Sequence, residues 1–309
     1  HLSCCHETAV IRTPPSGGGA GRRDREAPGR QRTVLGLASV AVTVAAYTLV
    51  ANAYGRPDIL PTARTLLAAL ASLVTGQAVA PAGGHTHPSD QVAHLLAQNV
   101  TLQGALLAST ARVLFGVGVG SVLWILAGLA MGWSRRVDEY LHPIYVLVRS
   151  IPPLALITYV MLWFGHGEAH RLIPIVYAVF TTVVIPTYHG VRDVADVYVQ
   201  AARALGAGRR LLFARVVLPA ASPFVLSGLR YALLIAWMTT VGVEMLMGDD
   251  GIGHLIVSGG LWASRLEIRV DPAVVMVGIL GLATVGLVMD AAAQTIADRL
   301  TFWARGRRS

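Results

Sequence analysis

Residues 113–134 read Val-Leu-Phe-Gly-Val-Gly-Val-Gly-Ser-Val-Leu-Trp-Ile-Leu-Ala-Gly-Leu-Ala-Met-Gly-Trp-Ser, a run of 22 residues without a charge between Arg112 and Arg135. A helix that spans a bilayer needs roughly 17 to 25 predominantly apolar residues. The run therefore predicts a transmembrane α-helix, and it decides the class of fold to which the rest of the chain must conform.

Five more stretches repeat this pattern along the chain. Four of them are uncharged runs of 18 to 23 residues, at 33–55, 150–167, 172–191 and 272–289. The fifth, from about Phe224 to Leu246, is interrupted by Arg230 and carries Glu244 near its end. We therefore expect an all-α membrane protein with six transmembrane helices. We interpret the weaker stretches 65–89 and 91–111, which contain prolines, glycines and polar amides, as surface or interfacial helices in an external loop.

The composition agrees with a membrane protein. Of 309 residues, 54% are hydrophobic and 14% are charged, and the mean hydropathy is +0.58. A soluble domain usually carries about 25% charged residues, so soluble-enzyme and disordered classes are excluded. All 25 basic residues are arginine. Without lysine there is no Walker A phosphate loop and no Schiff-base lysine, so we expect no ATP hydrolysis by this chain. We also expect no cofactor bound by this chain and no nucleic-acid partner.

The distribution of arginine predicts the orientation. Six spans place both termini on one side of the membrane. The two tails and the loops at 134–143 and 190–222 hold 17 of the 25 arginines, against six in the opposite loops and their edges. By the positive-inside rule both termini are cytoplasmic. We expect a disordered basic tail over 1–32, a transmembrane domain over 33–300 and a basic tail over 301–309. No small-residue cleavage site follows the first apolar run, so we expect no signal peptide.

Three small motifs have simple interpretations. Cys4 and Cys5 lie in the tail and are too close together for a zinc site. The histidines of the external loop have metal-like spacing without a fixed scaffold, and we expect no metal at His85, His87 and His94. Alternating glycines within a predicted span favour close helix contact over a nucleotide loop at Gly116, Gly118 and Gly120.

The cytoplasmic loop 190–222 is the most informative segment. We expect a short helix that ends at Gly206, a turn, and a second helix that stops before Pro219. The small side chains of Ala201 and Ala202 leave room for a partner, and three apolar side chains are candidate anchors: Leu205, Leu211 and Phe213. Such a loop is shaped to dock into a groove on another protein.

This loop resembles the EAA loop of binding-protein-dependent ABC import permeases, which reads Glu-Ala-Ala, three residues, Gly, nine residues, then Ile-x-Leu-Pro. Val216 replaces the Ile, and Gln200 stands where the family usually has Glu. The resemblance implies that the ATPase-coupling residues are Gln200, Ala201, Ala202, Arg203, Leu205, Gly206, Arg209, Arg210, Leu218 and Pro219.

Flanking motifs are similar to permeases for nitrate, sulfonate, taurine and bicarbonate. They are Arg149-Ser-Ile-Pro-Pro, Trp163-Phe-Gly-His-Gly, Gly190-Val-Arg, Ser227-Gly-Leu-Arg and Gly251-Ile-Gly. The resemblance, which covers about residues 55–300, implies a type I ABC importer permease fold in the bacterial inner membrane. It also implies a second permease subunit, two cytoplasmic ATPase subunits that carry ATP and magnesium, and a periplasmic solute-binding protein. The implied substrate is a small anion, and a heterocyclic vitamin precursor is the alternative.

Charged and aromatic residues within the spans are candidates for the pathway. Charges at membrane depth are costly, so Arg230 attracts an anionic substrate, pairs with a carboxylate, snorkels toward the cytoplasm or forms a structural hydrogen bond to a neighbouring helix. Glu244 is a gate or pairing residue. Asp290 is expected as an interfacial charge at the inner end of the last span. Residues that either line the pathway or pack between helices are Tyr159, Trp163, Trp237, Thr239 and Thr240. A rival hypothesis, an intramembrane hydrolase, would use Ser227, followed by Gly228, as nucleophile and His189 as base.

Overall fold

The described part of the chain is almost entirely helical. A computed structural model describes residues 29–55, 60–76, 101–194, 196–260, 262–263, 268–269 and 271–301. The predictions for Cys4, Cys5, His85, His87, His94, most of the N-terminal tail and residues 302–309 lie outside these ranges.

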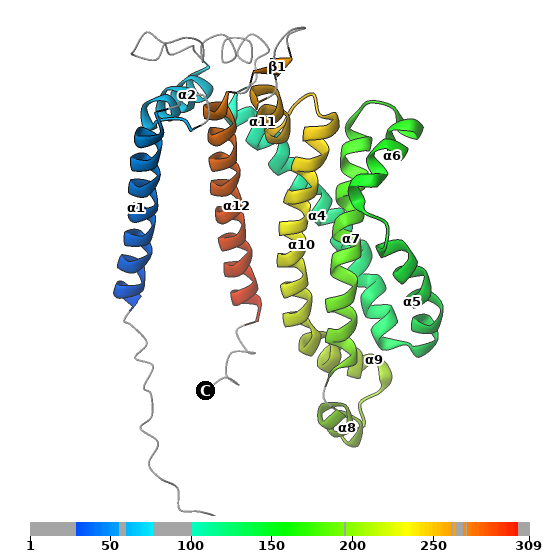
Figure 1. Cartoon of the computed structure of the whole chain (residues 1–309). Helices are drawn as coiled ribbons and strands as arrows, with labels where there is room; N and C mark the ends of the chain where they lie inside the picture. The colour runs from blue at the N-terminus through cyan, green and yellow to red at the C-terminus, as the bar shows by residue number, and fades with distance from the viewer. Residues whose placement is uncertain are drawn as a thin grey trace, which may run out of the picture. The chain divides into compact units, whose positions relative to one another are not determined.

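The helices are α1 (Gly29–Tyr54), α2 (Ala63–Thr75), α4 (Leu102–Trp133), α5 (Arg135–Arg149), the 3₁₀ turn η1 (Pro153–Ala155), α6 (Leu156–Phe164), α7 (Glu168–Arg192), α8 (Asp196–Ala204), α9 (Arg209–Leu212), the π-helix η2 (Phe213–Val217), α10 (Leu218–Met247), α11 (Ile252–Gly260) and α12 (Pro272–Leu300). Two short strands, β1 (Trp262–Ala263) and β2 (Ile268–Arg269), pair antiparallel. The chain divides into two units, His1–Val50 and Ala51–Ser309, and every described element after α1 belongs to the second unit. The all-α prediction is confirmed apart from this hairpin (Figure 1).

Four helical segments within the described residues are long and apolar enough to cross a membrane, or five if α5 and α6 form one bent span. The four are α4, α7, the helix Arg209–Met247 and α12, and they coincide with four of the predicted spans. The predicted span 33–55 falls on α1, whose side chains are described only over the apolar segment Ala38–Ala53, so this span stays a prediction.

The stretch 91–111 is not a separate surface helix where the structure describes it. From Leu102 onward it is the first part of α4, which runs without interruption past Arg112 to Trp133. The Thr101 hydroxyl caps this helix by accepting a hydrogen bond from the Gly104 N–H at 3.2 Å. Gln103, the one polar amide of this stretch within the described residues, is exposed in the first turn of α4, and Arg112 is paired with carboxylates, as shown below.

The predicted span 150–167 is shorter and broken. The residues of the predicted loop 134–143 lie in α5, and the chain then bends by 71° between α5 and the segment Pro153–Phe164. Pro152 and Pro153 provide no backbone N–H, which explains why the helix ends here. The Tyr177 hydroxyl on α7 donates to the carbonyls of Val148 and Ile151, so the bend is held by a neighbouring helix.

Glycines let α4 approach α7 closely. A Cβ atom on Gly120 would lie 2.8 Å from Val179 Cγ1 and 3.0 Å from the Val176 carbonyl oxygen, and one on Gly116 would lie 2.4 Å from Ile175. Gly128 and Gly132 continue the same stripe, whereas Gly118 has open space around it. The predicted close contact is confirmed for Gly116 and Gly120 and is wrong for Gly118, because a spacing of four keeps residues on one helix face.

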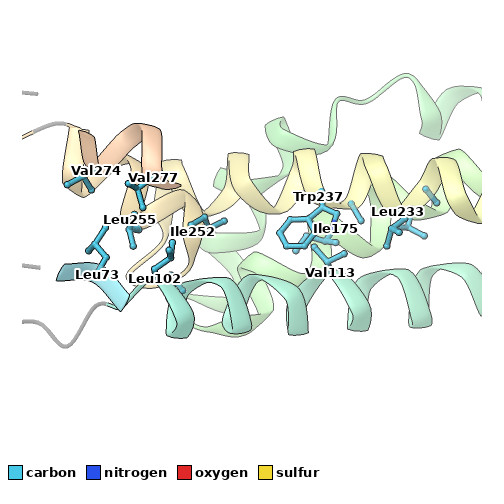
Figure 2. Close-up of a cluster of buried hydrophobic side chains, with 14 of the residues drawn as sticks. Leu73, Leu102, Val113, Ile175, Leu233, Trp237, Ile252, Leu255, Val274 and Val277 are labelled. Carbon is cyan, nitrogen blue, oxygen red and sulfur yellow. The ribbon is translucent and has the colours of Figure 1, made fainter. Parts of the chain in front are cut away.

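The main hydrophobic cluster ties the helices of the second unit together. Figure 2 shows Val113, Ile175 and Trp237 meeting between α4, α7 and α10. At one end of the cluster α2, α4, α11 and α12 converge, and their buried side chains include Leu73, Leu102, Ile252, Leu255, Val274 and Val277 (Figure 2). In a membrane these contacts stabilise the bundle through close packing, because lipid chains are as apolar as the side chains.

Candidate functional site

The segment between α7 and α10 folds as two helices joined by a tight turn. Gly206 has φ +79°, its N–H donates to the Arg203 carbonyl at 2.9 Å, and the Ala207 N–H donates to the Ala202 carbonyl at 3.0 Å. These two bonds form a Schellman motif, whose left-handed residue is most easily a glycine. The prediction that the first helix ends at Gly206 is confirmed.

The second helix does not stop before Pro219. α9 continues through η2 into α10 as one helix of 39 residues, Arg209–Met247. Within η2 the Leu218 N–H donates to the carbonyl of Phe213, five residues earlier. A proline ring collides with the carbonyl four residues back in a regular α-helix, and the wider π turn relieves that collision. The predicted break is wrong for this reason.

An aromatic contact fixes the base of this segment to the bundle. The rings of Phe213 and Trp133 lie 5.0 Å apart between centroids, and the Arg209 guanidinium lies 5.6 Å from the Trp133 ring centre. Val191 and Val217 are buried beside them. Phe213 therefore faces the chain's own helices, and its expected role as an anchor for a partner is wrong.

The tip of the segment is open to a partner. Leu205 is 88% exposed, and Val197 and Leu211 also leave apolar side chains uncovered. Ala202 and Pro219 are half-buried, and the other predicted coupling residues are exposed: Gln200, Ala201, Arg203, Leu205, Gly206, Arg209, Arg210 and Leu218. Apolar side chains gathered on an exposed, arginine-rich turn are typical of a surface that another protein covers.

Arg230 has a carboxylate partner on the last helix. Its Nε and one terminal nitrogen each lie 2.6 Å from an oxygen of Asp290, so the two form a bidentate pair between α10 and α12. Both side chains are half-exposed. Among the alternatives for Arg230 the structure shows pairing. Asp290 lies ten residues before the end of α12 and directly after the uncharged run 272–289, and its expected position at the inner end of the span stays a prediction.

Glu244 lies in a buried polar cluster near the C-terminal end of α10, away from the α8–α9 turn. It is 1% exposed, and its carboxylate accepts bonds from the Ser109 hydroxyl at 2.7 and 2.8 Å, from Arg112 at 2.8 Å and from the Gly253 N–H at 3.0 Å. The structure therefore shows the pairing alternative for Glu244. These contacts join α4, α10 and α11.

Arg112 extends the cluster to α7 and the turn after α10. It donates to both oxygens of Glu168 at 2.9 and 3.0 Å and to both oxygens of Asp250 at 2.7 and 2.9 Å. Arg171 pairs with Glu168, Asp249 and Asp250. The charge cluster thus comprises two arginines and four carboxylates: Arg112, Arg171, Glu168, Glu244, Asp249 and Asp250. It lies at the end of α10 away from α8 and α9 (Figure 1).

Sequence reasoning missed this cluster. Arg112 and Arg171 served only to delimit uncharged runs and to count loop charges. Both are buried, at 6% and 5% exposure. One local signal was available, because Glu168 lies three residues before Arg171, a spacing that places two side chains on one helix face.

The aromatic and hydroxyl candidates separate into two groups. Trp237, Thr239 and Thr240 are buried, and Trp237 packs in the main cluster, which fits the helix-packing interpretation. Tyr159 and Trp163 on α6 are 59% and 70% exposed. The structure does not bring the two groups together, and a pathway role stays a prediction for each.

The geometry does not support the hydrolase hypothesis. The Ser227 hydroxyl donates to the Phe224 carbonyl of its own helix at 2.9 Å, whereas His189 approaches Asp193 at 3.7 Å and meets the Tyr188 ring edge to face. A nucleophile and its base need a hydrogen bond between them. In the part of the chain that the structure describes, no group of three or more His, Cys, Asp or Glu side chains is placed to hold a metal ion.

Comparison with known proteins identifies relatives over most of the bundle. The profile described as "Binding-protein-dependent transport system inner membrane component" matches residues 121–302. A probable ABC transporter permease protein of Brucella melitensis is 35% identical over 205 residues, which cover 66% of this chain and 80% of the relative. The taurine transport system permease protein of Escherichia coli is 33% identical over 66% of this chain and 72% of the relative. The nitrate import permease protein of Synechocystis is 31% identical over 57% and 64%.

A solved structure has the same fold. The inward-facing MetNI methionine ABC transporter contains a chain that matches with a TM-score of 0.54 at 17% identity, covering 64% of this chain and 95% of that chain. At that identity the match shows the arrangement of helices alone.

Proposed function

The chain belongs to the family of binding-protein-dependent transport system inner membrane components, and on that premise we propose that it is the permease subunit of an ATP-driven ABC importer. As a member of this family it is a multi-pass membrane protein and a transport subunit. The proposal extends this to six spans with both termini in the cytoplasm of a bacterium and to insertion in its inner membrane.

The exposed turn between α8 and α9 carries the proposal. It offers uncovered apolar side chains around a rigid Schellman turn, as an ATPase groove requires. The chain contains no lysine and hence no Walker A loop, so the energy must come from a partner. Two ATPase subunits, each with ATP and magnesium, would bind the coupling segments of two permease subunits. A periplasmic binding protein would deliver the substrate from outside.

A small anion is the proposed substrate. The relatives named for taurine and nitrate support this class, because both ligands present an oxyanion group. Closure of the ATPases on ATP would drive the two permeases between outward-open and inward-open states, and only the state facing the binding protein would accept the anion.

Gentle extraction of the chain from its own membrane tests the proposal. Mass spectrometry of the bound proteins is expected to find an ATPase with a Walker A motif in equal amounts, crosslinked through residues 200–215. The same complex in vesicles, with its binding protein, is expected to take up labelled taurine or nitrate only when ATP is supplied. A chain that purifies without an ATPase even after crosslinking would refute the proposal.

A further inference from the structure

The bend between α5 and α6 adjoins a cavity that the sequence did not reveal. The cavity has a volume of about 600 Å³ and is open to the surface. Its walls come from α5, α7 and α10, and its polar lining residues are Tyr145, Arg149, Thr181, Thr182, Ser227 and Tyr231. A volume of this size is within the usual range of small-molecule sites.

Arg149 supplies the charge of this cavity. It is the only charged residue in the lining, and no carboxylate in the described ranges forms an ion pair with it. Within the described residues it interacts with Tyr145, whose ring centre lies 6.0 Å from the guanidinium carbon and whose side chain is also hydrogen-bonded to it. The other arginines of the spans are neutralised: Arg112, Arg171 and Arg230 each pair with carboxylates. Arg149 therefore keeps a full positive charge available to a ligand.

The walls of the cavity are polar but carry no opposing charge. The hydroxyls of Thr181 and Thr182 donate to the Ala178 carbonyl, and the Tyr145 hydroxyl donates to the Thr181 carbonyl at 2.7 Å. Their hydrogens are used within the protein, whereas the guanidinium offers its N–H groups in a planar fork that matches an oxyanion. The Tyr231 hydroxyl, which has no bond within the described residues, is a second available donor.

The floor of the cavity is rigid. A Cβ atom on Gly228 would lie 2.4 Å from Pro186 Cγ, so the Pro186 ring of α7 packs directly against the α10 backbone at Gly228. The bend itself is held by Tyr177 on α7. Interrupted helices at membrane depth occur where the backbone is covered by protein or faces a water-filled cavity, and transporter substrate sites are commonly built beside them.

We propose that this cavity, the Arg149 cavity, binds an oxyanion group with one negative charge. A small substrate anion and the phosphodiester of a lipid headgroup both present such a group. Its assignment to the transported substrate rests on the proposed function, whereas the anion site itself does not.

Cysteine labelling tests the site without requiring transport. The full chain, with Cys4 and Cys5 changed to serine, carries Ser227→Cys and is placed in nanodiscs of phosphatidylcholine. Its reaction with an anionic sulfonate thiol reagent is compared with that of a cationic reagent of equal size. Because a nearby unpaired charge attracts the anionic reagent, we expect Arg149→Gln to lower the ratio of the two rates about tenfold. Arg149→Lys should restore part of it. The matched control Arg135→Gln, at the exposed start of the same helix, should leave the ratio unchanged.

Protection from labelling identifies the source of the oxyanion. Slower labelling with millimolar taurine or nitrate supports a substrate anion, and slower labelling only when phosphatidylglycerol is added supports a lipid headgroup. If the ratio of the two labelling rates is unchanged by Arg149→Gln and none of these anions slows labelling, the proposed anion site is refuted. A chain that binds its ATPase and transports, yet shows no such dependence, keeps the proposed function and loses the Arg149 cavity. A chain whose labelling ratio depends on Arg149 but that binds no ATPase supports the anion site and refutes the proposed function.

Discussion

At the scale of single residues, Arg112 holds the charge cluster together. Its guanidinium reaches Glu168, Glu244 and Asp250 from one buried position. The geometry uses the planar fork of arginine, which a lysine ammonium does not reproduce. Loss of Arg112 would affect Glu244 most, because Glu244 is 1% exposed and no other cation contacts it within the described residues.

Replacement of this arginine should destabilise the fold. We expect Arg112→Ala to cost about 3–5 kcal/mol, since it leaves a buried carboxylate without its partner. Arg112→Lys should recover only part of that loss. The unfolding midpoint of the purified protein in detergent, followed by tryptophan fluorescence, measures the effect.

Arg135 provides the control for this prediction. It pairs with Glu139 but is 88% exposed, and such surface pairs contribute about 0–1 kcal/mol. Arg135→Ala should therefore leave the midpoint nearly unchanged. Equal midpoints for Arg112→Ala and Arg135→Ala would show that the charge cluster does not stabilise the protein.

At the scale of helices, α4 and α7 pack through glycines spaced four apart. A side chain on Gly120 would meet both Val179 and the Val176 backbone, and a backbone atom cannot turn away as a side chain does. Gly118, on the neighbouring face, has nothing within 4 Å. Substitutions at Gly118 and Gly120 can therefore be compared to measure how much the contact between α4 and α7 contributes to stability.

A bulky residue should be tolerated at only one of them. We expect Gly120→Leu to cost about 1–3 kcal/mol through overpacking and Gly118→Leu to change stability little. Residual folded protein after heating, measured by size-exclusion chromatography in detergent, separates the two variants. If both lost the same amount, overpacking between α4 and α7 at Gly120 would not be the cause, since leucine has the higher helix propensity.

The turn between α8 and α9 yields a second helix-scale prediction. Gly206→Val places a β-branched residue at φ +79°, where left-handed backbone is strained for any side chain. We expect ATP-driven uptake to fall about tenfold or more while the protein still inserts, because the exposed turn has no buried contacts to lose.

Gly208 is the control for that turn. It lies two residues away at φ −68° and ψ 162°, a conformation that valine adopts readily, and nothing lies within 4 Å of its Cβ position. Gly208→Val should transport normally. Normal uptake by Gly206→Val would contradict the assignment of this turn to coupling.

At the scale of the whole molecule, the sequence was most informative where the signal is local. Hydropathy is a property of consecutive residues, so apolar runs located α4, α7, α10 and α12. The charge cluster could not be predicted from the sequence, because Arg112 and Glu244 are 132 residues apart and no local pattern connects them. The same holds for Arg230 and Asp290.

Sequence rules for where a helix starts or stops also failed where neighbouring residues or helices allow a different backbone conformation. A proline normally stops a helix, yet the π turn of η2 carries α9 past Pro219 into α10. The proline pair at 152–153 did break its helix, as expected, but the helix before the break began as early as Arg135. The Arg149 cavity needs α5, α7 and α10 together, so it could not be predicted from any one of them.

The orientation of the whole molecule can be tested by labelling from outside the cell. We expect Asp249→Cys to react with an impermeant maleimide in intact spheroplasts, and Arg210→Cys to react only after lysis, because the proposed topology places the arginine-rich loops in the cytoplasm. Both positions are exposed, so accessibility does not limit the reaction. The opposite pattern would invert the proposed topology.

The uninterrupted helix from Arg209 to Met247 can transmit a movement from one of its ends to the other. With 39 residues it is about 58 Å long along its axis, nearly twice the hydrocarbon thickness of a bilayer. If it rocks by about 5° around its midpoint, each end swings through roughly 2.5 Å in opposite directions. That stroke is close to the 2.8 Å between Arg112 and Glu244 at the far end. A displacement of the turn beside Arg209 would thus produce, at the other end of the helix, a movement large enough to separate this ion pair.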